Sequence, residues 1–219
     1  MSKKKIDIDE AVCILRKEIK ALPQPAVTRI AARKDPFRVL ISTVLSLRTK
    51  DSTTIDASLR LFEKASDIYK LAAMPQRDLE KIIYPVGFYR VKAANILKIC
   101  SIIIDKYKGR VPDTLEELLK LPGVGRKTAN LVITLGFGKP GICVDIHVHR
   151  ISNRFGITET EKPDETEFRL REILPKKYWI EYNDLLVTWG QNICTPVSPR
   201  CSVCALFDIC PALGVRKKR

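Results

Sequence analysis

The chain has 219 residues, is 45% hydrophobic and carries a formal net charge of +14 at pH 7. Its length allows one domain or two small ones, and no apolar run approaches the roughly 20 residues that a membrane-spanning helix needs. The seven cysteines are an odd number and no secretory signal segment is visible, which disfavours a secreted, disulfide-bonded protein. A positive excess of this size usually indicates a polyanionic partner, most often nucleic acid. We therefore expect a cytoplasmic, nucleic-acid-binding protein with no membrane association.

The first half of the chain predicts helices joined by short turns. Apolar residues with a 3.6-residue period predict an amphipathic helix over 7–21. A nearly continuous apolar run predicts a buried helix over 36–47, with Pro36 at its first position. Asp51 is placed to cap the next helix, over 52–64. Further helices are predicted over 76–83, 90–106 and 114–120, the last beginning with a capping box of Asp113 with Glu116 or of Thr114 with Glu117.

The segment Leu121-Pro122-Gly123-Val124-Gly125 separates that last helix from another predicted over 126–135. The proline ends the first helix, and the two glycines permit a tight hairpin that brings bare backbone close to a ligand. Free N–H groups at the start of the second helix form an anion site, which suits a phosphate diester and is independent of base sequence. The basic pair Arg126-Lys127 favours this interpretation over a plain helix–helix turn.

Two interpretations of Lys127 are open. It lies in the first turn of a predicted helix, where the helix dipole disfavours an ammonium and lowers its pKa, and a neutral amine is a nucleophile. The alternative is a lysine that only binds phosphate. Asp145 favours the nucleophile, because it lies among apolar residues 18 positions later and the intervening helix and glycine turn allow the chain to fold back. Asp145 is also placed to cap the helix that follows it, which is compatible with a second role.

Residues 142–149 alternate between apolar and polar in the manner of a strand, but one such run makes no sheet. We therefore predict a mostly or entirely α-helical fold. His147 and His149 lie in this run, and two histidines alone do not make a metal site. We expect them to pack or to contact phosphate.

An array of cysteines with the spacing C-x6-C-x2-C-x5-C lies near the end of the chain. A structural zinc site usually has two C-x2-C knuckles. The single knuckle and the wide, unequal loops here favour a [4Fe–4S] cluster over zinc, and an odd total of cysteines disfavours a pair of disulfides. Cys13, Cys100 and Cys143 lie in apolar surroundings and are predicted to be buried. The predicted cluster ligands are Cys194, Cys201, Cys204 and Cys210.

Taken in this order, the motifs resemble those of the endonuclease III family of DNA glycosylases, in the helix-hairpin-helix superfamily. The resemblance covers nearly the whole chain. It is carried by the runs Leu121 to Ala129 and Val144 to His147, by the cysteine array, and further upstream by Gly87 to Ala93 and Leu45 to Asp51.

The resemblance implies an all-α fold of two lobes. One would be a six-helix barrel over 29–139, which includes the helix-hairpin-helix at about 114–136. The other would join residues 1–28 to 140–219 and hold a [4Fe–4S] cluster in the loop 194–210. Damaged double-stranded DNA is the implied partner, bound in the groove between the lobes. We expect a monomer associated with the nucleoid.

The resemblance also implies base excision repair chemistry. Lys127 would attack C1′ of a flipped nucleotide and displace the base, and the resulting Schiff base would undergo β-elimination that nicks the strand. Asp145 would deprotonate or orient Lys127 and stabilise positive charge on the sugar. The implied substrates are oxidised, ring-saturated pyrimidines such as thymine glycol, together with abasic sites.

The other implied site residues contact DNA. Arg48 stands where many members have Gln, in the position that fills the gap left by the flipped base. Phe88 stands where the wedge residue is often Leu, and an aromatic wedge stacks on a neighbouring base. The remaining predicted DNA-binding residues are Leu121, Gly123, Val124, Gly125, Arg126 and His147.

Two alternative functions stay open. One is a monofunctional glycosylase of the same superfamily that acts on uracil or thymine mismatches. The other is a noncatalytic DNA-binding or redox-signalling module, in which the hairpin and the cluster are both structural. Lysine at position 127 argues against the adenine-mismatch branch, which lacks it.

Overall fold

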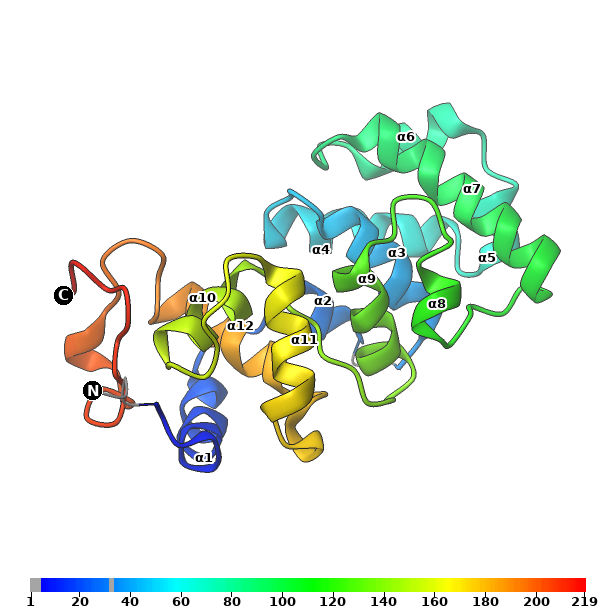
Figure 1. Ribbon diagram of the computed structural model, residues 1–219. Helices are drawn as coiled ribbons and strands as arrows, with labels where there is room; N and C mark the ends of the chain where they lie inside the picture. The colour runs from blue at the N-terminus through cyan, green and yellow to red at the C-terminus, as the bar shows by residue number, and fades with distance from the viewer. Residues whose placement is uncertain (1–4, 32–33) are drawn as a thin grey trace. The chain divides into compact units, whose positions relative to one another are not determined.

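The computed structural model describes residues 5–31 and 34–219, and within these ranges it contains helices and no strand (Figure 1). The predicted all-α fold is therefore confirmed. The chain divides into two compact units. The contiguous unit runs from Ala26 to Gly141, and the terminal unit combines the residues before Ala26 with Ile142–Arg219. No helix in the described ranges is long and apolar enough to cross a membrane.

The contiguous unit is built around helix α3 (Pro36–Ser46), which contacts α2, α4, α7 and α9. Its residues from Val39 to Leu45 are all buried, as expected of a helix that is apolar on every side. Asp35 accepts hydrogen bonds from the backbone N–H groups of Phe37 (3.0 Å) and Arg38 (3.2 Å), which fixes the start of the helix. The other helices of the unit are α2 (Ala26–Ala31), α4 (Asp51–Lys64), α5 (Ile68–Ala72), α6 (Gln76–Ile83), α7 (Tyr89–Tyr107), α8 (Leu115–Leu118), α9 (Arg126–Leu131) and the π-helix η2 (Val132–Gly136).

The predicted helices over 36–47, 76–83 and 90–106 match α3, α6 and α7 to within one residue at each end. The predicted cap of α4 is wrong, since Asp51 is its first helical residue and Lys50 precedes it as the cap. The Asp51 carboxylate instead accepts a hydrogen bond from the backbone N–H of Ala26 at 3.2 Å. It therefore ties α2 to α4, a role that depends on packing between helices.

Helix α8 is shorter than predicted, and Thr114 caps it by accepting a hydrogen bond from the Glu117 N–H at 3.3 Å. Asp113 instead pairs with Lys139. The helix predicted over 126–135 begins as α9 and continues as the π-helix η2. A Cβ at Gly136 would lie 2.9 Å from Pro36 Cα, so only glycine allows η2 to pack this closely on α3.

The terminal unit is organised around α12 (Tyr182–Asn192), which contacts α10 (Ile146–Arg154) and α1 (Ile8–Glu18). The run 142–149 is no strand, because α10 begins at Ile146. Cys100 and Cys143 are buried as predicted, but Cys13 is exposed because it lies on the polar face of the amphipathic helix α1. The unit also contains η1 (Ile19–Ala21), α11 (Pro163–Ile173), η3 (Lys176–Tyr178) and η4 (Cys201–Val203).

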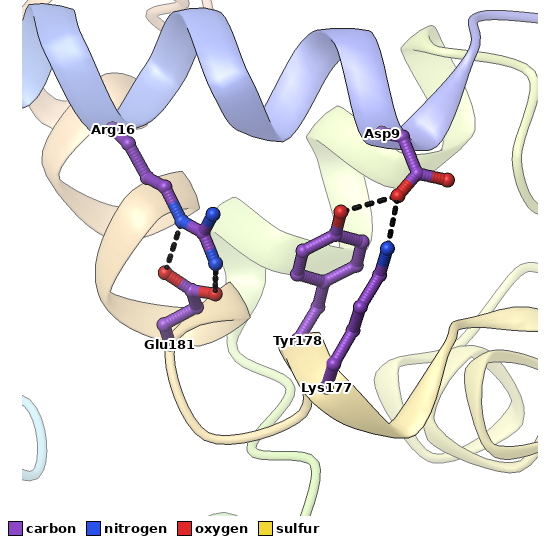
Figure 2. A network of polar contacts seen from close by, with 5 residues as sticks. All are labelled: Asp9, Arg16, Lys177, Tyr178 and Glu181. Carbon is purple, nitrogen blue, oxygen red and sulfur yellow. Dashed lines mark hydrogen bonds and ion pairs between the residues drawn. The ribbon is translucent and has the colours of Figure 1, made fainter.

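A polar network fastens the N-terminal helix α1 to the C-terminal part of this unit (Figure 2). The Arg16 guanidinium donates two hydrogen bonds to the Glu181 carboxylate, one of them from Nε at 2.9 Å. About two helical turns earlier, the Asp9 carboxylate accepts hydrogen bonds from Lys177 Nζ and from the Tyr178 hydroxyl. These bonds join segments more than 160 positions apart, which makes the two ends of the chain parts of one unit.

Candidate functional site

The hairpin between α8 and α9 is fastened by two apolar side chains. Leu121 is 2% exposed and Val124 is 6% exposed, and both belong to the core of the contiguous unit. The Val124 N–H donates to the Leu121 carbonyl at 3.1 Å, which closes the turn. Because these side chains face the core, any DNA contact by Leu121 or Val124 has to use the main chain.

The two hairpin glycines differ in backbone conformation and in the space around them. Gly123 has a φ of +74°, and a Cβ there would lie 2.9 Å from Asn95 Nδ2, so both the backbone and its neighbour exclude a side chain. Gly125 has an extended φ of −96° and open space where a Cβ would be. Both glycines are exposed, so nothing in the protein itself requires glycine at 125, and a closely approaching ligand would explain it.

Arg126 and Lys127 are the first two residues of α9 and are half-buried. The next residues, Thr128 and Ala129, are buried in the contiguous unit. The Asn130 side chain donates a hydrogen bond to the Arg126 carbonyl at 3.1 Å, which ties down the first turn. Lys127 therefore lies in a fixed helix start, two positions after the exposed Gly125.

Arg48 and Phe88 lie side by side, although they are 40 positions apart in the sequence. The Arg48 Cζ is 5.7 Å from the centroid of the Phe88 ring, within the range of a cation–π contact. Both side chains are exposed, and both residues adopt the left-handed conformation, with φ of 52° and 58°. The structure thus brings together the two residues predicted to enter the DNA helix.

Lys92 lies within the motif run Gly87 to Ala93, where no role was predicted for it, yet it is buried beside these loops, at 7% exposure. Its Nζ donates hydrogen bonds to the carbonyls of Leu45 and Leu47 and to Thr49 Oγ1. Burial lowers the pKa of Lys92 to about 8. A lysine on the apolar face of a predicted helix, next to Ala93 and Ile96, is the sequence signal that identifies it.

Asp145 lies in the terminal unit and is buried, at 9% exposure. Its Oδ1 accepts hydrogen bonds from the backbone N–H groups of His147 (2.8 Å) and Val148 (2.9 Å). The predicted cap of the following helix is therefore confirmed, and this cap fixes the orientation of the carboxylate. The catalytic roles of Lys127 and Asp145 stay predictions.

The two histidines of α10 have different surroundings. His147 Nδ1 lies 3.1 Å from Arg150 Nη2, and because a guanidinium only donates, Nδ1 accepts and a neutral ring carries its proton on Nε2. A Cβ at Gly190 would lie 2.5 Å from the same Nδ1, so α12 packs directly on this side of the ring. His149 Nδ1 lies 2.7 Å from Thr166 Oγ1, and burial lowers the pKa of His149. His149 therefore has a packing role, and His147 lies against Arg150 and α12.

The four cysteines of the array line one cavity of about 210 Å³, together with Phe155 and Trp189. Among the residues that the structure describes, no three His, Cys, Asp or Glu side chains are grouped so as to hold a single metal ion. Burial raises the pKa of Cys204 to about 11 and also raises the pKa of Cys210. The four thiols therefore lie around one shared cavity.

Two arginines of α10 hold the start of the cysteine loop. Arg154 donates to Cys194 Sγ at 3.2 Å and to the carbonyls of Thr195 and Pro196, each at 2.8 Å. Arg150 donates to the Cys194 carbonyl at 2.8 Å. Donors of this kind orient a ligating thiolate and stabilise its charge. Neither residue was predicted from the sequence, and the i,i+4 spacing of two arginines on one helix is the signal that identifies them.

A family model matches more than half of the chain. The description of that model is "HhH-GPD superfamily base excision DNA repair protein", and it covers residues 41–176. The endonuclease III of Thermotoga maritima is 53% identical over 176 residues, which is 80% of this chain and 83% of that protein. The chain belongs to the endonuclease III family. The resemblance inferred from the motifs is therefore confirmed.

Two solved structures from this family contain DNA. One is a non-covalent endonuclease III–DNA complex, which matches with a TM-score of 0.82. The other is a trapped endonuclease III–DNA covalent intermediate, with an estranged adenine, which matches with a TM-score of 0.80. In each comparison the identity is 38%, and the match covers 93% of this chain and 93% of the other.

Proposed function

We propose that the protein is a bifunctional DNA glycosylase and abasic-site lyase of base excision repair that removes oxidised pyrimidines of the thymine glycol type. The observation that carries the proposal is the position of Lys127 in the first turn of α9, directly after the exposed main chain of Gly123 and Gly125. An amine is thereby placed beside a hairpin suited to a DNA phosphate. Membership of a family in which a covalent DNA intermediate has been trapped supports the same chemistry.

The nucleophile of the reaction is the side-chain nitrogen of Lys127. Its Nζ attacks C1′ of the flipped nucleotide, the new C–N bond forms, and the glycosidic bond breaks as the base leaves with its electron pair and takes up a proton. Ring opening gives a Schiff base between Lys127 and the sugar. Loss of a proton from C2′ then expels the 3′ phosphate by β-elimination, which nicks the strand on the 3′ side of the lesion.

Asp145 assists at two points. Its carboxylate accepts the proton of the attacking amine and stabilises the positive charge that develops on the sugar. The two backbone N–H groups that it caps fix the carboxylate before DNA arrives, so little reorganisation is needed during the reaction.

The remaining residues hold DNA. The main chain of 121–125 and Arg126 bind phosphate without reading base sequence. His147 is a further proposed contact to DNA. Arg48 fills the gap left by the flipped base and Phe88 stacks beside it. The net charge of +14 adds long-range attraction to damaged duplex DNA, and the protein acts as a monomer at the nucleoid.

Cys194, Cys201, Cys204 and Cys210 are the proposed ligands of a [4Fe–4S] cluster. Base release and β-elimination transfer no electrons to or from the protein, so the cluster serves structure, not chemistry. We assign it the folding of the loop 194–210 and the presentation of exposed basic residues such as Arg200 to DNA phosphate.

Borohydride trapping tests the proposal. The wild type is incubated with duplex DNA that carries thymine glycol, and Lys127→Gln is compared with Lys120→Gln, which removes an exposed lysine of the same hairpin. We expect a covalent adduct and strand cleavage with the wild type and with Lys120→Gln, and neither with Lys127→Gln. Lys127→Gln should still bind the duplex.

Other outcomes identify the alternatives. Base release from uracil or thymine mismatches without a covalent adduct would indicate a monofunctional glycosylase. Duplex binding with no base release from any lesion would favour a noncatalytic DNA-binding module. Strand cleavage retained by Lys127→Gln would contradict the amine mechanism.

A further inference from the structure

Two loops of the contiguous unit carry strained residues that the fold has to hold in place. Arg48 lies in the loop after α3, and Phe88 lies in the turn before α7. Both have positive φ. Residues other than glycine rarely adopt this backbone conformation, and it persists only where the surroundings enforce it. The contacts around these two residues therefore have to supply the constraint.

Lys92 supplies this constraint for the loop after α3, which carries Arg48. Its Nζ donates to the Leu45 carbonyl at 2.8 Å, to the Leu47 carbonyl, and to Thr49 Oγ1 at 3.1 Å. These acceptors lie on both sides of Arg48 and use all three N–H bonds of the ammonium. The two carbonyls belong to the C-terminal end of α3, where acceptors lack intrahelical partners and a cation is favoured. With a pKa lowered to about 8, the ammonium is still the main form at neutral pH.

Thr49 joins the two loops. Its hydroxyl accepts from Lys92 and also from the Gly87 N–H at 3.2 Å. A Cβ at Gly87 would lie 2.6 Å from the Arg48 carbonyl oxygen, so the two loops touch through their backbones and only glycine permits the approach. The backbone N–H of Lys92 donates to the Phe88 carbonyl at 3.0 Å. Lys92 thus bonds to both loops, with its side chain to one and its backbone to the other.

We infer that Lys92 is a positioning residue for DNA insertion, which with Thr49 locks Arg48 and Phe88 into one preformed pair that enters the duplex as a unit. This inference rests on the proposed function. Two residues on independent loops would each lose conformational freedom on entering DNA, whereas a preformed pair has already lost it in the folded protein. The cation–π contact at 5.7 Å keeps the guanidinium against the aromatic ring, so the base-reading group and the stacking group arrive together.

The first test compares Lys92→Met with Lys98→Met, which removes an exposed lysine from the same helix. We expect Lys92→Met to slow base release from a paired lesion in duplex DNA by about tenfold to a hundredfold. Its lyase activity on a single-stranded abasic oligonucleotide, which requires no insertion, should stay within about twofold of wild type. Lys98→Met should leave both rates unchanged. Equal losses on both substrates, or no loss on the duplex, would overturn the inference.

A second measurement needs no DNA. Hydrogen exchange of the Thr49 and Gly87 amides in the free protein should be about tenfold faster in Lys92→Met than in wild type, and unchanged in Lys98→Met. The milder Thr49→Val, which keeps the shape of the side chain, should accelerate the Gly87 amide alone. Unchanged exchange in Lys92→Met would show that Lys92 does not hold the loops. If the wild type neither releases base nor forms an adduct, the proposed function fails, and this exchange experiment still decides the role of Lys92 in the loops.

A mutant cycle tests whether Lys92 acts through the pair. In a protein that already carries Arg48→Ala and Phe88→Ala, adding Lys92→Met should cause no further loss of base release from duplex DNA. A further loss as large as in the wild-type background would assign the effect of Lys92 to something other than the pair, and would overturn the inference.

Discussion

The hairpin 119–125 and the cysteine loop 194–210 are both irregular segments, but they are fixed in opposite ways. The hairpin inserts Leu121 and Val124 into the core of the contiguous unit. In the fully described segment 194–210, the buried residues are limited to Pro199 and Leu206. That loop is held instead by arginine side chains, and we propose that a cluster bound by the four cysteines completes its support. A loop with its own apolar anchors is stabilised by burial, whereas a loop with few of them depends on polar bonds and, in this proposal, on a metal centre.

The largest predicted loss of stability comes from removing one of the four proposed cysteine ligands. Metal binding contributes on the order of 10 kcal/mol to folding in small metal-dependent domains, and few apolar contacts are left to replace it here. We expect Cys194→Ser to lose bound iron and to become protease-sensitive over 194–219, while 26–141 stays protected. Iron analysis and limited proteolysis with mass spectrometry measure both effects.

Cys13→Ser is the matched control, because Cys13 is exposed and lies outside the array. It should keep wild-type iron content and wild-type protease resistance. A stable, iron-containing and fully active Cys194→Ser protein would show that the loop needs no fourth ligand.

The hairpin should respond to loss of apolar volume instead. Leu121→Ala removes a side chain that is 2% exposed, and we expect the free energy of unfolding to fall by about 3 kcal/mol. Leu119→Ala, in the same hairpin but 36% exposed, should cost about 0.5 kcal/mol. Denaturant titrations of both variants measure the difference. Similar costs at the two positions would mean that burial does not fix the hairpin.

Arg154→Met tests the polar support of the cysteine loop. It leaves the carbonyls of Thr195 and Pro196 without their arginine donor, and we expect a cost of about 2 kcal/mol. Hydrogen exchange should accelerate in 194–200 and stay unchanged in the hairpin. Arg200→Met, at an exposed position of the same loop, is the control. Equal exchange rates in the two variants would show that Arg154 does not stabilise the loop.

The smallest predicted effect concerns pH and the network that holds α1. Hydrogen bonds from Lys177 and Tyr178 lower the pKa of Asp9 below its usual value of 3.8. A carboxyl with a lowered pKa in the folded state contributes stability that is fully present above the pKa of the unfolded state and is lost as pH falls through the lower value. Unfolding free energy should therefore decrease slightly more steeply below about pH 4 in the wild type than in Asp9→Asn.

The effect is small because these side chains are exposed and solvent screens them. Asp78→Asn, which removes an exposed ion pair of the contiguous unit, should retain the wild-type pH dependence below about pH 4. An Asp9→Asn protein with the wild-type acid dependence would show that the network contributes nothing at low pH.

Much of the fold was predictable because its determinants are local. Periodicity and caps within about 20 residues defined α1, α3, α6 and α7, and a short motif defined the hairpin. The short helices α2 and α5 were not predicted, because they have few residues to show a period. Cys13 was wrongly predicted to be buried and Asp51 to be a cap, because a local pattern does not reveal which neighbouring helix packs against a side chain.

The sequence by itself determined the family, the all-α class and the order of the chemical groups, since spacing within a motif is a property of neighbouring residues. The tertiary structure alone decided that Arg48 lies against Phe88, that Lys92 bonds to carbonyls up to 47 positions away, and that Arg154 contacts a cysteine 40 positions away. Such contacts form between segments that meet only after the helices have packed. Packing depends on the volume and burial of the whole core, which no single stretch of sequence contains.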